Sequence, residues 1–181
     1  MKRNKIAFSF IILPVLIMSS IMYKNNAPAY NEDTWSGTAS FQSTETSSDR
    51  TSVWKMEANI KANKGTVVHS RNFTDANGDH GECKSTDTTD LILLIDENIH
   101  EYSIMIPAPP CKGDQLLSDQ KIDYYEPDAM IQVEKQKFGT NQQTISGQIV
   151  TRDTAIDDAI TVEITNWHFK KDKKSVKNNK Q

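Results

Sequence analysis

The stretch SVWKMEANIKA (residues 52–62) alternates apolar and polar side chains with a period of two. Met56, Ala58 and Ile60 fall on one side of an extended chain, whereas charged and amide side chains fall on the other. Such alternation is typical of a β-strand that is buried on one face and solvated on the other. The stretch therefore predicts a β-strand in a sheet with one buried face.

Further segments have the length, the β-branched residues or the alternation of strands, and turns rich in Gly, Asn, Asp and Pro separate them. They cover residues 34–41, 65–71, 90–97, 100–109, 130–138, 144–153 and 159–169. Helical periodicity is weak, and we interpret residues 113–127 as a long loop. Residues 42–52 are a hairpin loop or an exposed strand pair. The expected fold is all-β: a single antiparallel β-sandwich or small β-barrel of about eight strands, spanning residues 30–169.

Two strands allow a prediction of which side chains face the core. In residues 159–169 we expect Ile160, Val162 and Ile164 to point inward, with the intervening polar residues pointing outward. The run DLILLIDE (residues 90–97) is continuously apolar, which favours a strand that is buried on both faces or lies in a sandwich core. The first prediction depends on the period of two, and the second on the unbroken apolar run.

The N-terminus has the pattern of a secretory signal. A basic start, MKRNK, precedes an uncharged apolar run over residues 6–22, and small residues follow at Ala27 and Ala29. This order is typical of an export signal, here with a cleavage point before Tyr30. An uncleaved membrane anchor is the alternative for residues 1–29, because seventeen apolar residues can just cross a bilayer. Either way we expect an exported protein that is periplasmic, secreted or on the cell surface.

The charge distribution argues against nucleic acid as a partner. Residues 30–169 hold 11 basic and 23 acidic side chains, a net charge of −12. Such a body repels phosphates, and its few basic residues are scattered. Residues 170–181 carry six lysines and one aspartate, which predicts a solvated, disordered basic tail.

Cys83 and Cys111 are the two cysteines of the chain. In an oxidising compartment, such a pair is most simply a disulfide. The spacing is too wide for a C-x-x-C redox pair, and no further ligands flank either cysteine to make a zinc site. We therefore expect a structural bridge.

The acidic stretch RNFTDANGDHGECKSTDTTD (residues 71–90) has two interpretations. Asp75, Asn77 and Asp79 match three positions of a calcium-binding loop, and Glu82 could complete a non-helical site. His80, however, stands where that loop requires glycine. The Asn-Gly pair is also a strong hairpin turn signal. We favour the turn, with calcium as the alternative; no other cofactor is expected.

Catalytic signatures are absent from the sequence. No paired-histidine zinc motif, nucleophile elbow or phosphate-binding glycine loop occurs. The tryptophans Trp35, Trp54 and Trp167 are expected to fill the core, with a ligand-facing role as the alternative. The sequence thus predicts an exported, non-catalytic domain that binds a protein, a glycan or a small apolar ligand. A secreted carbohydrate or lipid hydrolase and a calcium-stabilised structural module are the alternatives.

Overall fold

The computed structural model describes residues 33–138, 143–154 and 159–173. Within these ranges every regular element is a β-strand. The eleven strands are β1 (Trp35–Thr46), β2 (Arg50–Lys61), β3 (Lys64–Asp75), β4 (His80–Asp90), β5 (Ile92–Asp96), β6 (Glu101–Ala108), β7 (Cys111–Leu117), β8 (Gln120–Glu126), β9 (Ala129–Lys137), β10 (Thr144–Thr154) and β11 (Ile160–Lys171).

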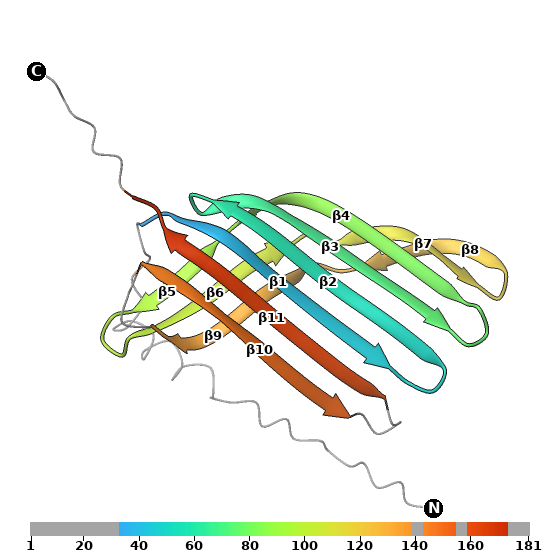
Figure 1. Cartoon of the computed structure of the whole chain (residues 1–181). Coiled ribbons are helices and arrows are strands. Elements are labelled where there is room, and N and C mark those ends of the chain that lie inside the picture. Colours follow the sequence, from blue (N-terminus) through green and yellow to red (C-terminus); the bar gives the residue numbers. More distant parts are fainter. Residues whose placement is uncertain (1–32, 139–142, 155–158, 174–181) are drawn as a thin grey trace, which may run out of the picture.

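The strands form two antiparallel sheets of unequal size. The larger sheet has the order β10-β11-β1-β2-β3-β4-β7-β8, and the smaller one has the order β5-β6-β9. Figure 1 shows the smaller sheet behind one half of the larger one, while the long strands continue well beyond it. The protein is therefore a two-layered, sandwich-like fold and not a closed barrel.

The hydrophobic core lies between the two sheets. From the larger sheet it takes residues of β1, β2, β3, β10 and β11, including Trp35 and Ile60, and from the smaller sheet it takes residues including Ile104 and Ile131. Trp167 is 4% exposed, and its indole N–H donates to the hydroxyl oxygen of Tyr102 at 2.9 Å, which joins the layers. The interior is filled with side chains, as expected for Trp35 and Trp167.

All eight predicted strands are present, but three others were missed. β4 lies inside the acidic stretch, and β7 and β8 replace the expected long loop. These strands carry charged or hydroxyl side chains on much of their length, so the apolar alternation that marks a strand is weak. Residues 42–52 form the end of β1, the start of β2 and their turn, which confirms the strand-pair interpretation.

The predicted facing of β11 is wrong. Thr165, Trp167 and Phe169 are buried against the core, whereas Ile160, Val162 and Ile164 lie on the opposite face. Both faces of β11 carry apolar side chains, so the alternation alone does not decide which face packs against the smaller sheet. Of the two alternatives for residues 90–97, the structure has the sandwich core: Leu91 and Leu93 are buried between the sheets, whereas the other face of the edge strand β5 is half-buried.

The two chain ends are only partly described. The predicted signal segment lies outside the described residues, and so do residues 174–181 of the predicted tail. β11 continues to Lys171, whose ammonium forms an ion pair with Asp33, so the strand extends two residues into that tail. No helix long and apolar enough to cross a membrane occurs among the described residues.

Candidate functional site

The smaller sheet leaves part of the larger sheet uncovered. The buried residues of β1, β2 and β11 gather at one end of these strands, near Trp35, Ile60 and Phe169. On the same face, the smaller sheet does not cover the other end of the strands, where most side chains are half-buried or exposed, although Ser52 and Phe73 are buried (Figure 1). We call this region the open half of the inner face. Its residues include Phe41, Ser43, Ser52, Trp54, Arg71, Phe73 and Glu163.

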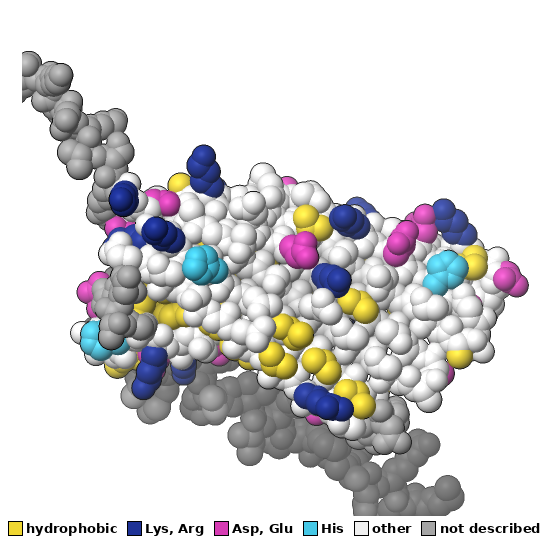
Figure 2. Space-filling model, viewed as in Figure 1, with side chains coloured by type: hydrophobic (Ala, Val, Ile, Leu, Met, Phe, Trp, Pro, Cys, Tyr) yellow, Lys and Arg dark blue, Asp and Glu magenta, His cyan; other side chains and the backbone are white. Residues whose placement is uncertain are grey.

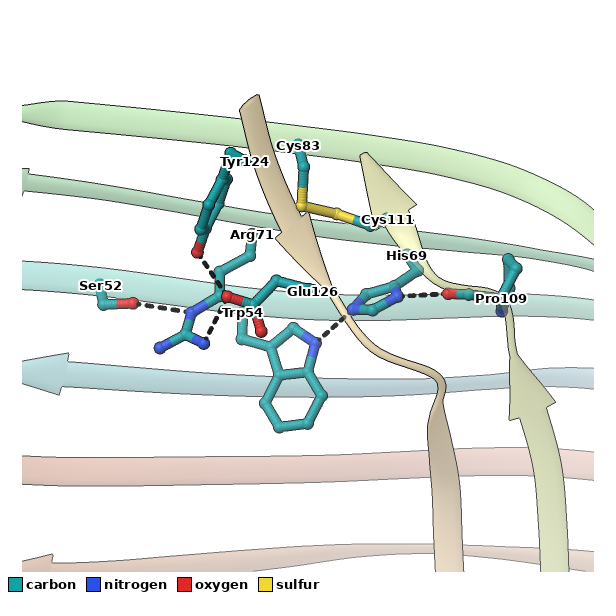
Figure 3. The surroundings of a disulfide bond; sticks show 9 residues. All are labelled: Ser52, Trp54, His69, Arg71, Cys83, Pro109, Cys111, Tyr124 and Glu126. Atoms are coloured by element: carbon teal, nitrogen blue, oxygen red, sulfur yellow. Dashed lines mark hydrogen bonds and ion pairs between the residues drawn. A yellow bond between two sulfur atoms is a disulfide. The ribbon is translucent and has the colours of Figure 1, made fainter. Parts of the chain in front are cut away.

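Trp54 is the tryptophan that faces this region. Its ring is half-buried and packs edge-on against Phe41, with 5.2 Å between the ring centroids. Its indole N–H donates to Nε2 of His69 at 2.7 Å (Figure 3). Of the three tryptophans, Trp54 is therefore the one with surface left to contact a ligand.

His69 holds Trp54 in place. The imidazole is fully buried, and its Nδ1 lies 2.6 Å from the carbonyl oxygen of Pro109. A carbonyl can only accept a hydrogen bond, and the Trp54 indole can only donate one. The neutral ring with its proton on Nδ1 satisfies both partners. His69 thus has a structural role that its sequence position did not reveal.

The larger sheet curls at its β8 edge. Arg71 on β3 reaches Glu126 on β8, with Nη1 2.8 Å from Oε1, although β4 and β7 lie between their strands. Two glycines on the inner face permit the curl. A Cβ on Gly81 would lie 2.5 Å from the Phe73 ring, and one on Gly113 would lie 2.0 Å from the carbonyl oxygen of Glu82.

The curl assembles a polar network beside the disulfide (Figure 3). Glu126 also accepts a hydrogen bond from the Tyr124 hydroxyl at 2.6 Å, and Arg71 Nε donates to the hydroxyl of the buried Ser52 at 3.3 Å. Tyr124 packs edge-on against Phe73. The network holds β8 against β3 at the border of the open half, and it contains no nucleophile paired with a base.

Cys83 and Cys111 form the predicted disulfide, which confirms that interpretation. Their Cα atoms lie 5.5 Å apart, and both side chains are buried. The bridge ties β4 to the first residue of β7, directly after Pro109 and Pro110. The bridge therefore fixes the start of β7, the strand that pairs with the curled edge strand β8.

The pKa of Tyr124 is raised above its usual value, which makes the stability of the folded protein depend on pH in the alkaline range. Burial and the hydrogen bond to Glu126 raise the pKa of Tyr124 from 10.0 to about 12, although Arg71 acts in the opposite direction. The unfolded chain releases this proton near pH 10, so the folded state binds more protons between pH 10 and 12. We expect the Tyr124 contribution to stability to fall as the pH rises through this window.

Urea unfolding at pH 9, 10 and 11 tests this titration. The free energy of unfolding should decline with pH, and it should decline less in Tyr124→Phe than in the wild type. An equal decline in both proteins would contradict the raised pKa of Tyr124.

The acidic stretch forms the β3–β4 hairpin. Asp75 Oδ1 accepts hydrogen bonds from the backbone amides of Asn77 and Asp79, and Gly78 adopts a positive φ of 89°. Asp79 Oδ1 accepts from the amide of Ser118. Glu82 lies farther along β4, opposite Asn72. These contacts match the turn interpretation, and no group of three or more metal-ligating side chains occurs in the described part of the chain.

The outer face of the larger sheet is mostly uncharged and polar. Figure 2 shows this face, where most of the surface is uncharged and polar, charged side chains are scattered, and a group of apolar side chains lies over β10 and β11. Shallow depressions on it are lined by residues such as Thr38, Asn59, Asn166 and His168. Their lining contains small hydroxyl and amide side chains, with the strand backbone beneath. This face therefore offers hydrogen-bonding groups but no aromatic platform comparable to Trp54.

No family model matches the chain, and no similar curated protein or solved structure was found. The residues that build the open half were largely missed by sequence reasoning. Phe41, Arg71, Tyr124 and Glu126 come from three separate parts of the chain. Their meeting depends on strand order and curl, for which the sequence carries no local signal.

Proposed function

We propose that the protein is an exported, non-catalytic domain that acts by binding a macromolecular ligand through the open half of the inner face. The observation that carries the proposal is Trp54. Its half-buried indole is fixed by the buried His69 on a part of the sheet that the smaller sheet does not cover. A rigid aromatic side chain provides contact area at little cost in conformational entropy, which is why tryptophan is common at binding sites.

The surroundings of Trp54 favour a ligand with both apolar and polar groups. Phe41 extends the aromatic surface, while Ser43 and Glu163 lie on neighbouring strands of the same face. Trp35 and Trp167 are both buried between the sheets, so neither ring has surface left for a ligand. These features support contact with an extended protein or glycan surface at the envelope or outside the cell.

Export is a separate part of the proposal. The basic and apolar N-terminal residues and the buried disulfide support it. We expect the full chain, expressed in a bacterium with a secretory pathway, to be found outside the cytoplasm with Cys83 and Cys111 oxidised. Cell fractionation followed by alkylation without reduction tests this. A cytoplasmic protein with two free thiols would contradict export.

Replacing Trp54 is expected to weaken binding without unfolding the domain. We would apply the exported protein to one array of glycans and one of peptides, and compare it with Trp54→Ala. Truncation of a central aromatic contact residue typically costs about 2 kcal/mol or more, roughly a thirtyfold loss of affinity. The titration of any ligand found on either array measures this loss.

Tyr125→Ala is the matched control. Tyr125 is 56% exposed and lies on β8 next to Tyr124, so its side chain points to the opposite face of the sheet. This variant should bind as the wild type does. A ligand held equally well by Trp54→Ala, or the absence of a ligand on both arrays, would contradict the proposed function.

A further inference from the structure

The two sheets have four edge strands, and three of them are protected against pairing. An unprotected edge strand is a template for another strand, and proteins usually block it with charges, prolines, bulges or a short length. β5 is five residues long. β9 has an irregular register against β6 near Lys135, whose φ is 47°. β8 carries Lys121, Asp123 and Glu126 and is followed by Pro127.

β10 lacks these features. It extends over eleven residues, contains no proline and pairs regularly with β11 along its length. Its charged residues, Arg152 and Asp153, are confined to one end. No described strand pairs with its other side. β10 therefore presents a long, regular edge of the kind that pairs with another strand.

The hydrogen-bonding pattern shows which backbone groups this edge presents. The amide of Lys171 donates to the carbonyl oxygen of Gln143, which sets the phase of the β10–β11 ladder. In an antiparallel pair, hydrogen-bonded residues alternate with residues whose N–H and C=O point away. The outward groups therefore belong to alternate residues of β10: Thr144, Ser146, Gln148, Val150, Arg152 and Thr154.

We propose that β10 pairs antiparallel with β10 of a second copy of this chain, about a two-fold axis at Ile149. In this register the whole strand overlaps, because Thr144 lies opposite Thr154 and Gln148 lies opposite Val150. The outward-pointing residues of one copy then meet those of the other, so their N–H and C=O groups pair. The two eight-stranded sheets become one continuous sheet with a self-complementary interface.

Charge and apolar surface are both compatible with this register. Arg152 lies opposite Ser146, and Asp153 lies opposite Ile145, so no charge faces a like charge. Val150 is 57% exposed on the outer face, next to Ile164 on β11. Figure 2 shows apolar side chains gathered over this part of β10 and β11. A neighbouring strand would cover part of this surface as well as the half-buried Ile149.

Cysteine cross-linking tests the register. Ile149→Cys places two thiols opposite each other in a pair whose Cα atoms lie about 4.5 Å apart, within the range of a disulfide. Thr151→Cys is the matched control on the same strand and face. It lies opposite Gly147 of the second copy, and the two introduced thiols are separated by four residues, about 13 Å along the strands. In the full chain, expressed for export, we expect a cross-linked dimer on a non-reducing gel for Ile149→Cys and none for Thr151→Cys.

A second pair of variants tests the backbone pairing. Gln148→Pro removes an outward N–H without removing a bond to β11, and should raise the dimer dissociation constant at least tenfold. Gln148→Ala retains that N–H and should leave the constant unchanged. Light scattering of the purified full chain measures both, and circular dichroism reports whether each variant is folded. If Gln148→Pro fails to fold, the cross-linking result decides.

The proposal would be overturned by a monomeric wild type that does not cross-link through Ile149→Cys. Equal cross-linking of both cysteine variants would also overturn it, as would a folded Gln148→Pro variant with wild-type self-association. A monomer that instead accepts an unrelated peptide along β10 would mean that the edge has a different partner. The dimer does not depend on ligand binding at Trp54, so either proposal can fail alone.

Discussion

Replacing both cysteines, Cys83→Ala with Cys111→Ala, is expected to lower the free energy of unfolding by about 3–4 kcal/mol. The bridge closes a loop with a sequence separation of 28, and a cross-link of this length removes that much conformational entropy from the unfolded chain. For a domain of this size the corresponding fall in Tm is roughly 10 °C. Urea unfolding and a thermal melt of the double variant measure the two quantities.

The effect should be greatest at the curled edge. Cys111 begins β7, and β7 holds β8 with its residues Tyr124 and Glu126. Hydrogen exchange should therefore accelerate in β7 and β8 more than in β1 or β2, whose strands lie away from the bridge. Wild-type protein under a reducing agent is the control and should match the double variant. A reduced protein with unchanged stability would contradict the structural role of the bridge.

Ile104→Ala is expected to cost about 2–5 kcal/mol of unfolding free energy. Ile104 is 0% exposed and lies in β6, the central strand of the smaller sheet, where it faces the core between the layers. Its truncation leaves a cavity that surrounding side chains fill only in part. Chemical denaturation should show a lower midpoint with an unchanged slope.

Ile99→Ala is the matched control for this variant. It removes the same atoms from a side chain that is 56% exposed, in the turn between β5 and β6. We expect a change within about 0.5 kcal/mol, as is usual for surface positions. Similar losses in the two variants would mean that the smaller sheet does not pack on the larger one as described.

The sequence predicts this fold well where one face of a strand is apolar. Met56, Ala58 and Ile60 alternate strictly, and all three are buried. β4 was missed because hydroxyl and charged side chains occupy most of its length, and its burial depends on Cys83 and Gly81. β11 was assigned the wrong face because both of its faces carry apolar residues, and only the packing of the layers decides between them.

The candidate site could be predicted only in fragments. The disulfide was predicted from the number of cysteines and the expected export of the chain, without any knowledge of strand order. The distinction among the tryptophans did not follow, since Trp35, Trp54 and Trp167 all lie near strand ends in the sequence. It arises because the smaller sheet covers one half of the larger sheet, which is a long-range property of the topology.

The exposure of the three tryptophans tests the account most directly. We would label the protein with 5-fluorotryptophan, record the fluorine NMR spectrum in H₂O and in D₂O, and assign the resonances with Trp54→Phe. The account predicts one solvent-sensitive resonance, which is missing in that variant and moves when a ligand is added, and two insensitive resonances from Trp35 and Trp167. Solvent-sensitive Trp35 or Trp167, or a Trp54 resonance shielded from solvent in the free protein, would contradict it.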